Sequence, residues 1–335
     1  MSTTEQQLTK KDFASDQDIR WCPGCGDYAI LAQVQKVFPK LGIPKENIVV
    51  VSGIGCSSRF PYYMNTYGFH SIHGRAPAIA SGVKLANPNL DVWVITGDGD
   101  AMSIGGNHFV HVLRRNIDMK ILMFNNRIYG LTKGQYSPTS EVGKITKSTP
   151  MGSLDYPFNP PALAFGASAT FIGRTIDKEL KHMGTMIEEC SKHIGTSFLE
   201  IYQNCNIFND GAFSNLTDRD IKSDNVIVLE ENMPMIFGKE KDKGLILEGT
   251  QFKVVTLGDD YSDSDLIVHN PLDRNLGLII SEMTYNEDLP VPIGVFYKEE
   301  KPTYDSMMLE QLESAKSKNL DLQSLIQGPN PWEVK

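Results

Sequence analysis

Apolar and polar positions alternate along the chain with two different periods. Short runs rich in β-branched residues are typical of buried strands, and they occupy residues 47–53, 91–97, 119–125, 168–173 and 197–203. Between these runs, apolar residues recur with helical spacing over 28–41, over 76–87 and again after residue 100. Strands that alternate with helices predict an α/β fold, in which a mostly parallel sheet carries helices on both faces.

The same pattern divides the chain into three parts. Residues 1–18 are polar and charged, and we expect them to form an N-terminal arm. Residues 19–215 hold the strand and helix patterns, so we expect one α/β domain there, with ligands at the carboxyl ends of its strands. From about residue 206 the sequence is polar and turn-rich, and residues 216–335 are interpreted as a C-terminal extension with a tail.

Composition restricts the class of protein. The chain has 335 residues and a net charge of −9, which disfavours nucleic acid as a partner. No run approaches the ~18 apolar residues of a membrane span, and the first residues lack the apolar segment of a signal peptide. Five cysteines in a chain of this size argue against a disulfide framework. We therefore expect a cytoplasmic protein that binds neither nucleic acid nor a membrane.

Two polar motifs follow neighbouring strands of the predicted sheet. The sequence GDGD occupies residues 97–100, and two asparagines occupy 125–126. The two glycines let the backbone approach a ligand closely, and the helix that follows points free N–H groups at the same place, which suits a diphosphate. Asp98 and Asn126 offer the oxygen ligands that Mg²⁺ prefers. Either motif alone is better explained as an ordinary turn or loop, but the two together predict a site for Mg²⁺ and a diphosphate.

Four cysteines are candidate metal ligands. Cys22 and Cys25 form a C-x-x-C pair, whereas Cys56 and Cys205 each follow a predicted strand. Such a set can bind zinc or a [4Fe–4S] cluster, and one local pair joined by two distant single residues favours the cluster. A redox-active C-x-x-C pair is a further alternative, but it leaves the two distant cysteines without a role. Cys190 lies on the apolar face of a predicted helix, where core packing explains it.

Six segments of the chain carry a resemblance to a known family. In their order they resemble the β subunit of 2-oxoacid:ferredoxin oxidoreductases, most of all the 2-oxoglutarate branch, and the match spans nearly the whole chain. The segments are WCPGCG (21–26), GIGCSSR (53–59), HGRA (73–76), GDGDAMSIGGNH (97–108), NNRIYGLTKGQYSPTS (125–140) and YQNCNIFNDGAF (202–213).

The resemblance implies a set of cofactors and the residues that hold them. Thiamine diphosphate is expected with Mg²⁺, whose protein ligands are Asp98, Asn126 and the carbonyl of Ile128. A [4Fe–4S] cluster is expected on Cys22, Cys25, Cys56 and Cys205. A structural hydrogen bond is the alternative role for His73, and core packing is the alternative for Leu131. The residues expected to bind cofactor are Ile54, Gly55, Cys56, Ser57, His73, Gly97, Asp98, Gly99, Asp100, Asn126, Gly130 and Leu131.

The resemblance also implies an activity. The family catalyses a reversible, thiamine diphosphate-dependent oxidative decarboxylation of a 2-oxo acid to acyl-CoA and CO₂, with coenzyme A as co-substrate and ferredoxin as electron acceptor. For 2-oxoglutarate the product is succinyl-CoA. Its distal carboxylate needs a cation, and we expect Lys133 or Arg59 to supply it, with His73 as a further substrate contact.

A larger partner subunit is expected. Only 96 residues precede Gly97, too few for a separate pyrimidine-binding domain by the usual domain size of ~100–200 residues, so an α subunit would supply it. We expect αβ pairs, which can dimerise further. Three alternatives stay open: a member specific for pyruvate or another 2-oxo acid, a non-oxidative thiamine-dependent decarboxylase subunit, and a zinc-stabilised binding module without catalysis.

Overall fold

The computed structural model describes residues 8–317, 321–332 and 334. The expected N-terminal arm at 1–18 and the expected C-terminal tail therefore lie partly outside the described residues. None of the helices in the described ranges is both long and apolar enough to cross a lipid bilayer.

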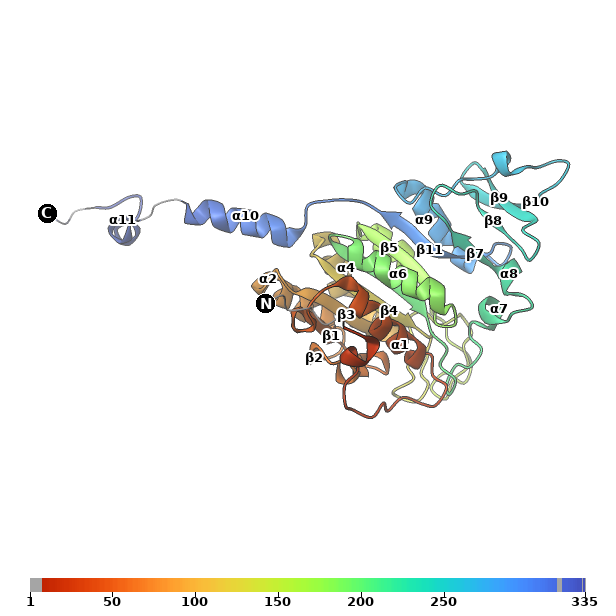
Figure 1. The fold of residues 1–335 in the computed structure, drawn as a ribbon, viewed down its shortest axis with the longest axis horizontal. Helices are drawn as coiled ribbons and strands as arrows, with labels where there is room; N and C mark the ends of the chain where they lie inside the picture. Colours follow the sequence, from red (N-terminus) through yellow and green to blue (C-terminus); the bar gives the residue numbers. More distant parts are fainter. Residues whose placement is uncertain (1–7, 318–320, 333, 335) are drawn as a thin grey trace, which may run out of the picture.

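Eight strands form one sheet in the spatial order β2-β1-β3-β4-β6-β5-β11-β7 (Figure 1). Every neighbouring pair is parallel except β5 and β11. The predicted α/β fold with a mostly parallel sheet is thus confirmed. The strands are β1 (Ile48–Ser52), β2 (Tyr67–His70), β3 (Asp91–Gly97), β4 (Met119–Asn125), β5 (Phe171–Ile176), β6 (Thr196–Tyr202), β7 (Val226–Leu229) and β11 (Val291–Lys298).

Helices cover both faces of this sheet. One face packs against α2 (Ala76–Ala86), α4 (Gly106–Arg115), α5 (Pro160–Gly166) and α9 (Arg274–Glu282). The other face packs against α1 (Asp27–Val37) and α6 (Leu180–Lys192). Because successive side chains of a strand point to opposite faces, Val49 and Val51 join the first core and Val50 joins the second. Burial on both faces explains why the strands read as continuous apolar runs.

Two predicted elements differ in detail from the structure. The strand expected at 168–173 begins at Phe171, because α5 ends just before it and Ser168 adopts a left-handed turn with φ 60°. The single helix expected after residue 100 is two helices, α3 (Asp98–Met102) and α4, separated by the turn at 103–105.

The chain beyond residue 215 contributes to the main sheet as well as to a smaller one. Strands β7 and β11 complete the eight-stranded sheet, and Ile280 and Phe296 belong to its first core. The main core therefore extends across the boundary expected at 215, and the division into domains stays a prediction. This part of the chain also holds α7 (Ser214–Thr217), α8 (Lys222–Asn225) and an antiparallel sheet of β8 (Ile236–Phe237), β9 (Lys243–Glu248) and β10 (Gln251–Thr256). Phe237 of β8 and Leu245 of β9 belong to the same core.

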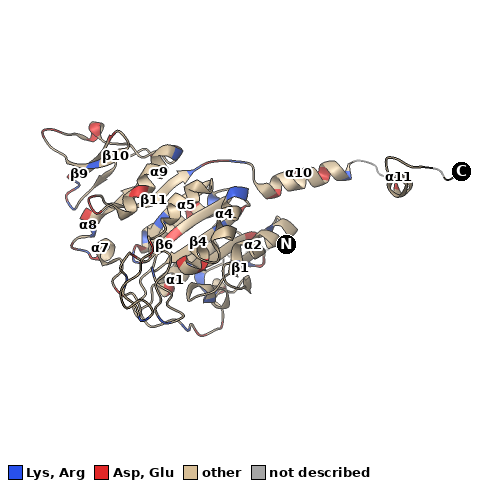
Figure 2. Cartoon of the chain, turned by 180° about the vertical axis from the view of Figure 1, so that it is seen from behind, with Lys and Arg blue, Asp and Glu red and all other residues tan. Residues whose placement is uncertain are grey.

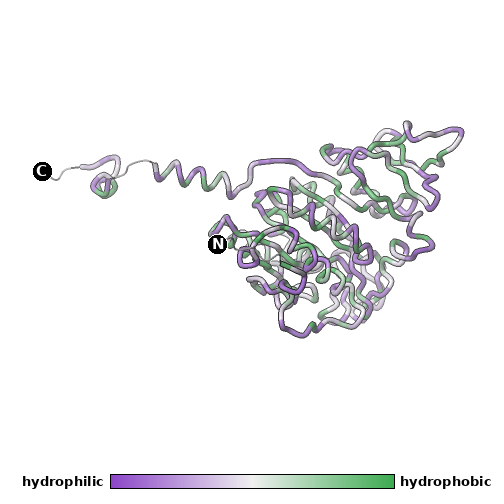
Figure 3. Tube along the Cα trace, in the orientation of Figure 1, coloured by the Kyte–Doolittle hydropathy of each residue, from purple (hydrophilic) through white to green (hydrophobic). Residues whose placement is uncertain are grey.

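The two C-terminal helices differ in position and in hydropathy from the elements of the main sheet. In Figure 1, α10 (Tyr304–Lys316) leads away from the sheet, and α11 (Leu322–Gln327) follows it in the sequence. Figure 3 shows hydrophobic segments concentrated in the central sheet, whereas hydrophilic and hydrophobic residues alternate along α10. Charged residues of both signs are spread over the elements of the molecule in Figure 2.

Candidate cofactor site

The candidate site lies where four neighbouring strands of the sheet end. Strands β1, β3, β4 and β6 are adjacent and parallel, so the loops after them leave from the same edge. These loops carry the motifs 53–57, 97–100, 125–132 and 203–205. Three of them, together with His73, enclose a pocket of about 280 Å³. The fold thereby brings together lining residues from Ile54 to Thr132, which are 78 positions apart in the sequence.

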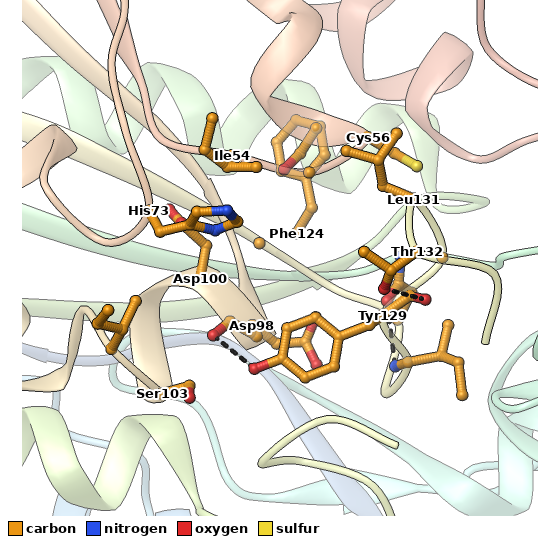
Figure 4. A pocket seen from close by; sticks show the side chains of 18 residues that line it. Ile54, Cys56, His73, Asp98, Asp100, Ser103, Phe124, Tyr129, Leu131 and Thr132 are labelled. Atoms are coloured by element: carbon orange, nitrogen blue, oxygen red, sulfur yellow. Dashed lines mark hydrogen bonds between the residues drawn. The ribbon is translucent and has the colours of Figure 1, made fainter. Parts of the chain in front are cut away.

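The pocket contains every residue expected from the sequence to bind the thiamine cofactor or its metal. These are Ile54, Gly55, Cys56, Ser57, His73, Gly97, Asp98, Gly99, Asp100, Asn126, Ile128, Gly130 and Leu131. In Figure 4, His73 stands on one side of the pocket, and Tyr129, Leu131 and Thr132 stand on the other. Five further lining residues were not expected from the sequence: Ser103, Ile104, Phe124, Tyr129 and Thr132.

Asp98 is a buried carboxylate at the base of this pocket. It is 2% exposed, and its Oδ2 accepts hydrogen bonds from the hydroxyls of Ser137 (2.5 Å) and Thr139 (2.7 Å). Burial raises the pKa of Asp98, and the hydroxyl donors oppose that shift. A divalent cation beside the carboxylate would favour its charged form, so the residue fits a metal ligand.

Asn126 lies on the loop after β4, beside the β3 motif that carries Asp98. Its Oδ1 accepts a hydrogen bond from the backbone N–H of Ile128 at 3.2 Å. This bond folds the loop into a tight turn, so the Asn126 side chain and the Ile128 residue both line the pocket together with Asp98. The donor set combines a carboxylate, an amide oxygen and a backbone carbonyl, which are the oxygen ligands that Mg²⁺ takes.

Asp100 has a different environment from Asp98. Its Oδ1 accepts a bond from the backbone N–H of Gly74 (2.7 Å) and its Oδ2 accepts one from the Thr96 hydroxyl (2.9 Å). Burial raises the pKa of Asp100, and the Gly74 N–H is the largest opposing influence. The carboxylate therefore ties the loop that carries His73 to the end of β3, and this contact sets where the imidazole stands in the pocket wall.

Gly99 must be glycine because Tyr129 packs directly on it. A Cβ at position 99 would lie 2.2 Å from the Tyr129 ring, far inside van der Waals contact. The Tyr129 hydroxyl also donates to the Gly99 carbonyl at 3.0 Å, as the dashed line in Figure 4 marks. The ring thus covers the GDGD motif and narrows the pocket.

The four candidate cysteines meet beside this pocket. Cys56 belongs to the pocket wall itself, and a Cβ placed on Gly130 would lie 3.4 Å from the Cys205 Sγ and 3.8 Å from the Cys56 Sγ. Burial raises the pKa of Cys25, and the charges of Cys56 and Cys205 add to that rise. The fold therefore brings these sulfur atoms close enough for their charges to interact.

The negative charge of deprotonated thiols at the cysteine cluster, formed by Cys22, Cys25, Cys56 and Cys205, favours binding of a positively charged group. Burial raises the pKa of Cys56 to about 12, with further increases from Asp27, Cys205 and Cys22. Thiolates are the metal-binding form, so four of them in this place need positive charge to offset their repulsion. An iron–sulfur cluster fits that need. Within the described ranges, no three His, Cys, Asp or Glu side chains converge tightly enough to hold a single ion.

Cys190 lies elsewhere, as its helical pattern predicted. It is fully buried in the core formed by α1, α6 and the sheet, and burial raises the pKa of its thiol. Its surroundings are apolar side chains such as Met186 and Ile187. The residue packs like a small hydrophobic side chain.

The two cations expected to select the substrate do not line the pocket. Lys133 is exposed and directly follows the lining residue Thr132, in a loop turn where its φ is 76°. Arg59 is half-buried and lines a separate hollow with Asp16, Asp18 and Tyr62. Lys133 is therefore next to the pocket in the sequence, whereas Arg59 faces a different surface.

A buried polar network supports the floor of the site. Arg174 and Glu200 are both fully buried, and Arg174 Nε donates to Glu200 Oε2 at 2.6 Å. Asn125 Nδ2 donates to the other Glu200 oxygen at 2.7 Å, and Asn125 Oδ1 is 2.9 Å from the Thr139 hydroxyl that reaches Asp98. The network was not predicted, although the hydroxyl-rich run YSPTS after the paired asparagines was a signal that could have indicated part of it.

Comparison with known proteins identifies the domain and the family. Residues 53–201 match the family described as thiamine pyrophosphate enzyme, C-terminal TPP binding domain. The 2-oxoglutarate oxidoreductase subunit KorB of Mycobacterium tuberculosis is 50% identical over 99% of this chain and 90% of the relative. Subunit beta of 2-oxoacid:ferredoxin oxidoreductase 1 from Aeropyrum pernix is 47% identical over 57% of this chain and 60% of the relative.

A solved structure has the same fold over almost the whole chain. It is that of the 2-oxoglutarate:ferredoxin oxidoreductase from Magnetococcus marinus with 2-oxoglutarate, coenzyme A and succinyl-CoA bound. The TM-score is 0.78 at 30% sequence identity, and the match covers 98% of each chain. The chain therefore belongs to the family of 2-oxoacid:ferredoxin oxidoreductase β subunits.

Proposed function

We propose that this chain is the β subunit of an enzyme that converts 2-oxoglutarate and coenzyme A to succinyl-CoA and CO₂. In this reaction the bond between the carboxylate and the 2-oxo carbon breaks, and a thioester to coenzyme A forms as the coenzyme A thiol releases its proton to solvent. The two electrons released pass to two molecules of oxidised ferredoxin, each of which accepts one. The reverse direction uses the same groups and consumes reduced ferredoxin.

One observation carries the proposal. The expected thiamine-binding residues line a single pocket, and the wall of that pocket includes Cys56, which is also a member of the cysteine cluster. Gly130, which also lines the pocket, lies beside the thiols of Cys56 and Cys205. A cofactor that activates the 2-oxo acid and a group that removes single electrons would therefore be neighbours, as an oxidative decarboxylation requires.

The residues of the pocket have separate tasks in this proposal. Thiamine diphosphate, when bound, would supply a carbanion for addition to the 2-oxo carbon, and a [4Fe–4S] cluster would accept single electrons. Asp98, Asn126 and the Ile128 carbonyl would hold Mg²⁺, which neutralises the diphosphate. Cys22, Cys25, Cys56 and Cys205 would hold the cluster, and the α subunit would contact the pyrimidine ring.

We propose Lys133 as the cation that pairs with the distal carboxylate of 2-oxoglutarate. It directly follows the lining residue Thr132 and is exposed, so its flexible side chain is free to turn toward a bound substrate. Loss of a hydrogen bond to a charged group costs about 2 kcal/mol, or roughly 30-fold. We therefore expect Lys133→Ala to lower kcat/KM about 30-fold for 2-oxoglutarate and far less for pyruvate. Arg59→Ala is the matched control, and an equal loss on both substrates in Lys133→Ala would contradict this role.

The activity is tested on the αβ enzyme after co-expression and anaerobic purification. We expect bound thiamine diphosphate, iron and sulfide, broad visible absorption near roughly 400 nm from the cluster, and ferredoxin reduction that needs both 2-oxoglutarate and coenzyme A. A colourless preparation that contains zinc would overturn the oxidoreductase. Faster turnover of pyruvate than of 2-oxoglutarate would overturn the proposed substrate.

A further inference from the structure

Gln203 lies between the two proposed cofactor sites. It directly follows β6 and is 1% exposed. Its Oε1 accepts a hydrogen bond from Asn126 Nδ2 at 2.8 Å, and its Nε2 donates to the Cys25 Sγ at 3.3 Å. One buried side chain thus contacts a proposed ligand of Mg²⁺ at one end and a proposed ligand of the iron–sulfur cluster at the other.

Neighbouring groups fix which end of the Gln203 amide faces which site. The N–H of Ile128 donates to Asn126 Oδ1, so the Nδ2 donor of Asn126 must face Gln203. That contact requires the oxygen of Gln203 on the Asn126 side. The Gln203 nitrogen then faces two acceptors, the Cys25 sulfur and the Asn204 carbonyl at 2.5 Å. The opposite orientation would set the Gln203 oxygen against both acceptors and Nε2 against a donor.

The contact to Cys25 is distinctive among the candidate ligands. Across the described residues, no other side-chain hydrogen bond ends on a cysteine sulfur. A donor aimed at this sulfur stabilises the thiolate, which is the form that binds a metal or cluster.

We propose that Gln203 is a shared positioning residue: it orients Asn126 for the metal and sets the reduction potential of the cluster through its hydrogen bond to Cys25. This inference rests on the proposed function. Hydrogen bonds to cluster sulfurs stabilise the reduced, more negative state and so raise the potential. A residue that orients a metal ligand typically changes metal affinity or activity by about 10–100-fold when it is lost.

The test compares two glutamine-to-methionine variants of the αβ enzyme. Gln203→Met keeps the length of the side chain but removes both hydrogen bonds. Gln35→Met is the matched control, because Gln35 is also buried and donates a bond, to the Tyr63 carbonyl at 3.1 Å. The cluster potential is measured by a redox titration followed by electron paramagnetic resonance, and thiamine diphosphate affinity by calorimetry at fixed Mg²⁺. We expect Gln203→Met to have a more negative potential and about 10-fold weaker affinity, and Gln35→Met to have neither.

A third variant separates the two contacts of Gln203. Gln203→Glu keeps an oxygen for Asn126 but has no donor for Cys25, so we expect a lower potential with affinity within threefold of the unmodified enzyme. If the Gln203→Met chain does not assemble with the α subunit, the potential of Gln203→Glu still tests the hydrogen bond to Cys25. An unchanged potential in either Gln203 variant, or unchanged affinity in Gln203→Met, overturns the shared role. An unmodified enzyme without iron or thiamine diphosphate would instead overturn the proposed function.

Discussion

Replacement of Asp98 by alanine would test whether the carboxylate at the base of the pocket binds the metal. Substitution of a residue that only hydrogen-bonds to a metal ligand already weakens metal binding by about 10–100-fold. Loss of the ligand itself is therefore expected to weaken thiamine diphosphate binding in the presence of Mg²⁺ by at least ~100-fold, or about 2.8 kcal/mol. The diphosphate would also lose the cation that neutralises it, which adds to the loss.

The structure predicts that the Asp98→Ala chain still folds. Two hydroxyls lose their acceptor, but Ser137 Oγ is 3.3 Å from Ser140 Oγ, and Thr139 Oγ1 is 2.9 Å from Asn125 Oδ1. Both hydroxyls can therefore rotate to another acceptor, so the destabilisation should stay near the ~1–3 kcal/mol of one unsatisfied buried group. The cysteine cluster is formed by other loops, and the iron content should not change.

Calorimetric titration of the cofactor into the depleted αβ enzyme measures the affinity, and iron assays on the same sample check the cluster. Asp155→Ala is the matched control. Asp155 is exposed on the loop between β4 and α5, which also carries Ser137 and Thr139. It lies outside the pocket and accepts a hydrogen bond from the Tyr136 hydroxyl at 2.7 Å. Affinity of Asp98→Ala within threefold of Asp155→Ala would refute Asp98 as a ligand. Joint loss of iron and cofactor would show instead that the substitution disrupts the fold.

Three further predictions concern the cluster, the buried network and pH. Cys205→Ala should lose cluster iron and sulfide whereas Cys190→Ala retains both, and the opposite result in iron assays would mean that the ligand set is wrong. Glu200→Gln should lower the free energy of unfolding in urea by about 3–5 kcal/mol, because it leaves the charge of Arg174 buried without a partner. The double variant Glu200→Gln with Arg174→Met should lose less than that. If the losses of the two single variants simply add in the double variant, Arg174 and Glu200 do not stabilise each other. Burial lowers the pKa of His182 to about 4. The unfolded chain therefore binds this proton first, so stability on the order of 3 kcal/mol is lost as pH falls from about 6.5 to 4. Replacement by His182→Gln should flatten the dependence of the unfolding midpoint on pH.

The local pattern of apolar residues was sufficient to predict the central strands of the main sheet. Strands β1, β3, β4 and β6 are buried on both faces, so each is a short apolar run bounded by glycine or polar residues. Because parallel strands end at one edge, the positions of Asp98, Asn126, Cys56 and Cys205 after their strands were enough to bring them together in the prediction.

Elements at the margins of the sheet could not be predicted in this way. All four residues of β2 are exposed, and its sequence YGFH is too short to show a clear strand pattern. Strand β11 contains Pro292 and Gly294, which are typical of turns rather than strands, and its partner β5 is far away in the sequence. Gln203 and Thr139 were missed for another reason: their roles depend on which loops meet in space, and no spacing in the sequence shows that.

The antiparallel pairing of β11 with β5 has a consequence for folding during synthesis of the chain. Gly294 pairs with Arg174, a partner synthesised 120 residues earlier. At about 5–20 residues per second, the open edge of β5 waits about 6–24 s on the ribosome before β11 emerges. An unpaired strand edge is a template for aggregation, and such distant pairing slows folding. A chain that stops before residue 291 lacks β11 and would keep that edge open permanently, so premature termination before this strand should yield insoluble protein rather than a shorter soluble one.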